Sequence, residues 1–196
     1  MPGFAVSLRG ESLLSVSTEG LNVLPVRVHS DLISPEFAFI DVSGGYYGDE
    51  ENKKHLIWLH EKEINPGDEV EVEFLEEIST LDPGKTIEEL YPDDEAQTGP
   101  SQSVEEIFKD LAKKPKVREK FSFRLVSPSE EDINSRTEEN DHSFGFCILW
   151  DWTRPNEARV SLSSNSLESV EKRQGGPEQA RFRLQFGKRV RWRVSA

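Results

Sequence analysis

Apolar and polar residues alternate along most of the chain, and this period of two is typical of strands that bury one face. Five such runs near the start predict strands at residues 4–8, 24–28, 37–42, 55–59 and 69–74. Five more near the end predict strands at residues 121–125, 144–152, 158–162, 181–186 and 189–194. Glycine and proline lie between the runs, as expected where a chain reverses. The pattern therefore predicts a mostly β protein with minor α structure.

The two groups of strands also match each other in sequence. A shift of 120 residues aligns 40–43 with 160–163 and 67–70 with 187–190, whereas 4–8 aligns with 121–125 at a shift of 117. An internal duplication explains these matches. The alternative, that two β-rich segments share only their alternation, stays open.

The same groups define the predicted domains. We expect an acidic β module at residues 1–78, a linker with short helices at 79–118, and a second β module at 119–196 that is a diverged repeat of the first. Each of these two similar small modules would be a sandwich or a partly open barrel. In the linker, Thr86 and Ser103 each begin a helix-capping box. The second of these helices carries an apolar stripe that includes Phe108, so we expect it to dock on a module.

The net charge of the chain is −13, and the charge is unevenly distributed. Residues 1–78 carry 16 acidic and 5 basic side chains, whereas residues 119–196 carry 12 and 13. An acidic chain disfavours nucleic-acid binding, which needs Lys and Arg to replace phosphate counterions. No run approaches the roughly 18 apolar residues of a membrane span. We expect no nucleic acid and no membrane but a protein partner of basic character, and a homodimer stays open.

Cysteine content and the N-terminal sequence bear on the compartment. Cys147 is the only cysteine, which excludes an intramolecular disulfide and fits a reducing compartment. Its apolar surroundings, FGFCILW, indicate a buried and inert thiol. The first residues lack the basic segment and apolar stretch of a secretory signal. We therefore expect a cytoplasmic protein.

Motifs of known chemistry are missing from the sequence. The segment 83–86 ends like a phosphate-binding loop, but Ser79 stands where the first glycine is required. His55 and His60 are five residues apart, so in a strand they would point to opposite faces and could not share a metal. We predict no catalytic residue, no cofactor and no metal site. An enzyme assembled from distant residues stays open, because a single sequence does not reveal such a site.

Two tryptophans form a candidate ligand platform. Trp150 and Trp152 are two positions apart in a predicted strand, so they would share a face, with Asp151 on the other. An aromatic pair beside an acid can stack a sugar or a peptide. Such a row is more often the core face of a sheet, and that interpretation stays open beside the platform.

The last predicted strand of each module has one apolar face and one charged face. The charged residues are glutamates in the first module and arginines in the second: Glu69, Glu71, Glu73, Arg189, Arg191 and Arg193. Like charges along one strand repel, and the two rows would relieve each other if they met within the chain or across a homodimer. Alternatively both rows are solvated, since exposed ion pairs contribute only about 0–1 kcal/mol each.

Three stretches resemble a family of small uncharacterised bacterial proteins: SLRGESL at 7–13, HLIWL at 55–59 and GDEVEV at 67–72. They correspond to the family's opening strand, its HxxWL strand and its closing GDEV strand, and the resemblance covers residues 4–77. The second half, with FGFCILW and LQFG, is similar to longer members. The resemblance implies a bacterial, cytoplasmic β module of unknown function and assigns no catalytic residue.

By elimination, the sequence favours a non-catalytic binding protein. An acidic inhibitor of the immunity type, which neutralises a basic bacterial toxin, would gain speed and specificity from charge complementarity. One alternative is a carbohydrate- or peptide-binding module that uses Trp150 and Trp152. The other is an enzyme with an unrecognised site.

Overall fold

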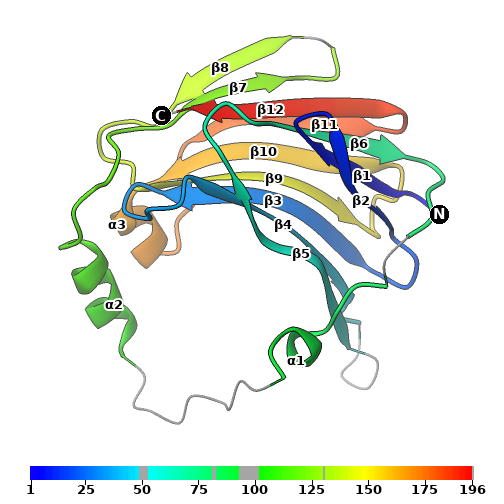
Figure 1. Cartoon of the computed structure of the whole chain (residues 1–196), viewed down its shortest axis with the longest axis horizontal. Coiled ribbons are helices and arrows are strands. Elements are labelled where there is room, and N and C mark those ends of the chain that lie inside the picture. Colours follow the sequence, from blue (N-terminus) through cyan, green and yellow to red (C-terminus); the bar gives the residue numbers. More distant parts are fainter. Residues whose placement is uncertain (49–52, 81–82, 93–101, 130, 196) are drawn as a thin grey trace.

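The structure, a computed structural model, describes residues 1–48, 53–80, 83–92, 102–129 and 131–195. Two six-stranded antiparallel sheets pack face to face, so the prediction of a mostly β sandwich is confirmed (Figure 1). Sheet A has the order β2 (Glu11–Ser17), β1 (Gly3–Leu8), β6 (Glu69–Leu75), β12 (Lys188–Ser195), β7 (Ser122–Val126) and β8 (Asp132–Arg136). Sheet B has the order β11 (Glu178–Gln185), β10 (Glu157–Asn165), β9 (Ser143–Asp151), β3 (Val23–Asp31), β4 (Ala38–Tyr46) and β5 (Lys54–Ile64).

One hydrophobic core fills the space between the sheets. Alternate residues of nearly every strand point into it, and a single cluster of buried side chains draws on both halves of the chain. Its largest fully buried members include Trp192, Phe4 and Phe74. The other residues of each strand face outward. On sheet B, this outer face is turned toward the side on which the helices α1 (Ile87–Leu90) and α2 (Val104–Leu111) lie (Figure 1).

The two predicted modules share both sheets rather than closing a sandwich each. Each half supplies three strands to sheet A and three to sheet B, and the halves meet at two seams, β6–β12 and β3–β9. The physical reason is that a pair of three-stranded sheets would leave four open edges and a small core. Joining the halves pairs one edge of each sheet and makes one larger core.

Strand pairing repeats with the offset that relates the two sequences. Adding 120 to the pair Ala38–Ile64 of β4–β5 gives the pair Ala158–Leu184 of β10–β11. The pair Val26–Val42 of β3–β4 likewise becomes Phe146–Leu162 of β9–β10. The positive φ angles of Gly67 and Gly187, 84° and 68°, recur at the same offset.

The first strand of each half departs from the predicted alignment. Phe4 pairs with Phe74 in β1–β6, and the corresponding position in β7–β12 is held by Phe123, which pairs with Val194. Phe4 therefore corresponds to Phe123 in the structure, two residues beyond the predicted Phe121. A displacement of two keeps the same face buried, so the alternation of apolar residues does not reveal it.

In the part of the chain that the structure describes, three short helices lie outside the sandwich: α1 (Ile87–Leu90), α2 (Val104–Leu111) and α3 (Leu167–Glu171). The capping boxes predicted at Thr86 and Ser103 are both formed. The prediction that α2 docks on a β module is wrong, because α2 has no buried residue and its neighbour is α3. With five residues, α3 is too short to cover the apolar stripe of α2, and Ile107 of that stripe stays 42% exposed. Part of the predicted linker, 81–82 and 93–101, lies outside the described residues.

Candidate binding groove beside β5

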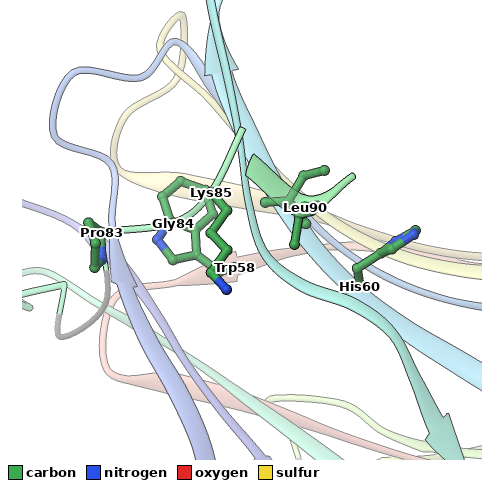
Figure 2. Close-up of a pocket in the computed structure, with 7 residues that line it drawn as sticks. Trp58, His60, Pro83, Gly84, Lys85 and Leu90 are labelled. Atoms are coloured by element: carbon green, nitrogen blue, oxygen red, sulfur yellow. The ribbon is translucent and has the colours of Figure 1, made fainter. Parts of the chain in front are cut away.

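Strand β5 is an edge strand of sheet B, and a short segment after β6 crosses it. Lys85 forms an isolated antiparallel bridge with Ile57, with both backbone hydrogen bonds at 2.8 Å. Gly84 makes this approach possible: its φ is 72°, and an added Cβ would lie 2.9 Å from Cε2 of Trp58. The segment therefore lies directly over the indole ring (Figure 2).

Among the pockets beside this segment, two share lining residues. The first, about 250 Å³, is lined by Ile57, Trp58, His60, Pro83, Gly84, Lys85 and Leu90 (Figure 2). The second, about 260 Å³, is lined by Ile57 and His60 again and by Arg27, His29, Asp41, Ser43, His55, Leu59 and Glu61. Because Ile57 and His60 line both, we treat the two pockets as one site and call it the β5 groove.

Asp41 is the best-connected polar residue of the groove. Its Oδ2 lies 2.6 Å from Nε2 of His29, and its Oδ1 lies 3.2 Å from Nδ1 of His60. The backbone N–H of Glu61 also donates to Oδ1, at 2.8 Å. We call Asp41, His29 and His60 the Asp41 cluster. If both imidazoles donate to the carboxylate, Nδ1 of His29 and Nε2 of His60 remain available to a ligand.

A β-bulge explains how one carboxylate reaches all three partners. Ile40 pairs with Lys62 and Val42 pairs with Leu59, so two residues of β5, His60 and Glu61, lie opposite Asp41 alone. Glu61 has a φ of 46°, in the left-handed region. This turn of the backbone brings its N–H toward the Asp41 carboxylate, together with the His60 ring.

The cluster keeps Asp41 ionised. Partial burial acts to raise the pKa of Asp41, but the hydrogen bonds from His29 and from the Glu61 backbone outweigh burial and lower the pKa below its usual value. The carboxylate is about one-fifth exposed, so its negative charge is accessible from the groove. His60 additionally meets the ring of Tyr91 edge to face at 6.0 Å.

Charged side chains of both signs line the groove. The carboxylates are those of Asp41 and Glu61, and the cations are Arg27 and Lys85. Exposed Lys62 and Glu63 follow along β5, and exposed Glu88 and Glu89 lie on α1. Exposed apolar surface accompanies them, because Ile87 is 53% and Tyr91 is 43% exposed. The groove thus combines charged groups with aromatic and aliphatic surface.

The predicted tryptophan platform does not form on one face. Trp150 is buried in the core and its Nε1 donates to the carbonyl of Pro155 at 3.0 Å. Strand β9 ends at Asp151, whose carboxylate accepts hydrogen bonds from Thr153, so Trp152 lies beyond the strand and is 63% exposed. The core interpretation holds for Trp150, and the alternation that would align Trp152 with it ends one residue too early.

The structure brings the two charged rows together within the chain. Strands β6 and β12 are neighbours in sheet A, with Glu73 opposite Arg189, Glu71 opposite Arg191 and Glu69 opposite Arg193. Arg193 Nη2 lies 3.2 Å from Glu69 Oε2, and Arg189 Nη1 lies 3.4 Å from Glu71 Oε1. Glu69 and Glu71 are therefore paired with arginines of β12.

Sequence reasoning did not identify the Asp41 cluster, although one signal was present. Asp41 lies in the predicted strand 37–42, and His29 directly follows the predicted strand 24–28; in the structure, both occupy outward-facing positions, in β4 and β3. Their diagonal contact and the bulge opposite Asp41 depend on strand register, which alternation alone does not determine. His55 and His60 were compared with each other, whereas the partner of His60 is an aspartate on the neighbouring strand.

Among the described residues, no group of three or more His, Cys, Asp or Glu side chains has a geometry that could hold a metal ion. None of the three helices in the described part of the chain is long and apolar enough to cross a membrane. Comparison with known proteins gives no match: no family model, no curated protein and no solved structure is similar to the chain. The resemblance to the bacterial family therefore stays a prediction.

The fold and the site define a β-sandwich protein with a polar groove along one sheet edge. In the described residues, the hydrogen bonds of His29 and His60 go to Asp41, and neither ring is bonded to a hydroxyl or a thiol. The geometry therefore provides a fixed carboxylate and two oriented imidazoles in a charged, partly aromatic groove.

Proposed function

We propose that this protein is a non-catalytic binding protein and that the β5 groove holds a basic segment of a protein partner. The observation that carries this proposal is the ionised, partly exposed Asp41 in a groove that Glu61 also lines, with Glu63 exposed further along β5. A Lys or Arg side chain entering the groove would meet a carboxylate already fixed by two histidines, so little ordering is needed on binding.

Aromatic groups of the groove support a cationic ligand. Trp58 and Tyr91 lie within the groove or at its rim, and aromatic faces attract ammonium and guanidinium groups. The edge position of β5 adds backbone donors and acceptors, and the Ile57–Lys85 bridge shows that this edge accepts a second strand. Specificity for a basic segment would then rest on charge, and affinity on aromatic and backbone contacts.

An acidic inhibitor of a basic toxin is one form that this function takes. Its negative groups would be Asp41 and Glu61 of the groove, since Glu69 and Glu71 of β6 are paired with arginines of β12. The proposal also keeps the cytoplasm as the compartment and an internal duplication as the origin of the two halves. The duplication is supported by the registers that recur at an offset of 120 residues.

A titration with two matched peptides tests the proposal. We expect tetra-arginine to shift the imidazole NMR signals of His29 and His60 of the full chain, and tetra-glutamate to leave them unchanged. In Glu61→Gln/Glu63→Gln, we expect the affinity for tetra-arginine to fall by about fivefold or more, since roughly 1 kcal/mol is lost when rim charges are removed. The control, Glu138→Gln/Glu139→Gln, makes the same change of charge on the loop after β8.

The control variant separates a site from general attraction. If both double variants lose affinity equally, the peptide is attracted by net charge and the groove is not its site. Equal binding of both peptides, or signal changes confined to residues outside the groove, would overturn the proposal. Cleavage or modification of the peptide that is lost in His29→Gln would replace binding with catalysis as the function.

A further inference from the structure

The chain places a lysine of its own at the open edge of β5. We call residues 83–91 the strap. Lys85 of the strap is paired with Ile57 through two backbone hydrogen bonds of 2.8 Å, one in each direction, in an antiparallel bridge. The Lys85 side chain lines the first pocket of the β5 groove. A lysine paired as in a β-strand thus already lies where the proposed function places a basic segment of a partner.

The residue before Lys85 shows what this position of the edge accepts. Gly84 has a φ of 72°, and an added Cβ would lie 2.9 Å from Cε2 and 3.0 Å from Nε1 of Trp58. The strap therefore approaches the indole ring more closely than a side chain allows (Figure 2). A segment that binds β5 in the same register needs a glycine immediately before its basic residue.

The strap has few contacts that would resist its release. None of residues 83–91 is buried, and the single turn of α1 within the strap satisfies its own capping box. At the far end of the strap, Tyr91 meets His60 edge to face at 6.0 Å but stays 43% exposed. Segments with few buried apolar side chains open locally at low free energy. The strap can therefore leave β5 while the sandwich stays folded.

The edge of β5 pairs with one segment at a time. On its open side, the N–H and the carbonyl of Ile57 both bond to Lys85. On the other side, Ile57 is paired with Ser43 of β4. Because a strand has only two sides, a second segment can pair at Ile57 only after the strap has left. The strap and a partner segment therefore exclude each other at this point.

We propose that the basic segment of the partner replaces the strap: it pairs antiparallel with β5 at Ile57, with a glycine over Trp58 followed by a lysine or an arginine. The strap is then an autoinhibitory contact, because an intramolecular segment competes at a high effective concentration. Any change that loosens the strap raises the affinity of the groove for the partner. Displacement of the strap rests on the proposed function, to which it adds the sequence of the bound segment and the regulation of the groove.

Two peptides of equal charge test the sequence requirement: acetyl-Arg-Gly-Lys-Arg and acetyl-Arg-Val-Lys-Arg. Their affinities for the full chain are measured from the imidazole NMR signals of His29 and His60. We expect the glycine peptide to bind about fivefold more tightly or better, because the valine side chain would collide with Trp58. Valine otherwise favours an extended backbone, so β propensity alone predicts the opposite order.

Variants that loosen the strap should strengthen binding. Gly84→Ala places a Cβ against Trp58 at a positive φ, and we expect it to raise the affinity for the glycine peptide about tenfold. Lys85→Pro removes the N–H that donates to Ile57 and should act in the same direction, which keeps the test valid if one variant does not fold. The matched control is Gly10→Ala, which should leave the affinity unchanged: the φ of Gly10 is 79°, but nothing lies within 4 Å of an added Cβ. Thermal unfolding shows which variants are folded.

Amide hydrogen exchange shows whether the strap leaves. In the free protein, the N–H groups of Ile57 and Lys85 are both hydrogen-bonded. With saturating glycine peptide, we expect Lys85 to lose protection and Ile57 to keep it, because a carbonyl of the peptide replaces that of Lys85. A peptide that binds elsewhere in the groove would leave both N–H groups protected.

The outcomes separate displacement of the strap from the proposed function. If the peptides shift the His29 and His60 signals while Lys85 stays protected, the groove binds a basic segment beside the strap, and displacement is overturned. Unchanged affinity in both Gly84→Ala and Lys85→Pro, or equal affinity of the two peptides, also overturns it. If neither peptide shifts these signals in wild type or in a loosened variant, the proposed function itself fails and displacement fails with it.

Discussion

The guanidinium carbon of Arg118 lies 5.4 Å from the ring centroid of Phe121, three residues further along the chain. The same group lies 5.5 Å from the ring of Phe37 and donates hydrogen bonds to the carbonyls of Asp31, Pro35 and Glu36. A single side chain thereby fixes the end of the 79–118 segment to the β3–β4 loop.

These contacts predict that replacing Arg118 lowers the stability of the protein more than most changes of a surface residue do. Arg118→Ala should lower the free energy of unfolding by about 2–4 kcal/mol, because it removes three hydrogen bonds from a charged donor and two cation–π contacts. Arg118→Lys should recover only part of the loss, since an ammonium group cannot reproduce the planar geometry. Urea denaturation measures both, with Lys120→Ala as the control. A loss below about 0.5 kcal/mol for Arg118→Ala would contradict this role, since ordinary surface changes lie in that range.

Asp41 predicts a pH dependence of stability. The pKa of Asp41 in the folded protein is below its usual value, so its contribution is fully present above about pH 4 and is lost as the pH falls through the lower folded pKa. Asp41→Asn should cost about 1–3 kcal/mol at neutral pH, and the difference from wild type should shrink toward pH 2. Equilibrium denaturation between these pH values tests this, and a difference independent of pH would contradict it.

The charged rows of β6 and β12 predict that reversing one of them is harmful and reversing both is not. Replacing Arg189, Arg191 and Arg193 by glutamate should lower the free energy of unfolding by about 1–3 kcal/mol, because three attractive cross-strand pairs become repulsive. Adding arginine at Glu69, Glu71 and Glu73 should restore most of that loss. The effect should weaken in high salt. A sextuple variant no more stable than the triple variant would show that the pairs contribute nothing.

The exposed position of α2 predicts a small effect for its apolar residues. Phe108→Ala should cost less than about 1 kcal/mol, because the side chain is only half-buried and its neighbour is the short helix α3. Phe146→Ala, in the core, should cost about 3–5 kcal/mol and serves as the comparison. Similar losses for both variants would indicate that α2 packs on the sandwich after all.

Local alternation was sufficient to predict most strands, since the buried face of each is visible in a few consecutive residues. Alternation did not predict that the two halves share both sheets and one core. Val70 and Val190 would alternate with charged residues in the same way whether they faced one shared core or two separate cores. The groove depends on one extra residue in β5 opposite Asp41, and a bulge has no signal in a single sequence.

The position of β12 has a consequence for how this chain is made. Strand β12, which follows all the other strands of the sandwich in the chain, lies in the middle of sheet A, between β6 and β7. Until it leaves the ribosome, both of those strands present unpaired backbone and apolar side chains, so the nascent chain passes through a long stage that favours association with other chains. Contacts between residues separated by more than a hundred positions also slow folding. We expect production of this protein to depend on chaperones more than its size suggests, and truncation of β12 to be far more damaging than loss of an edge strand such as β8.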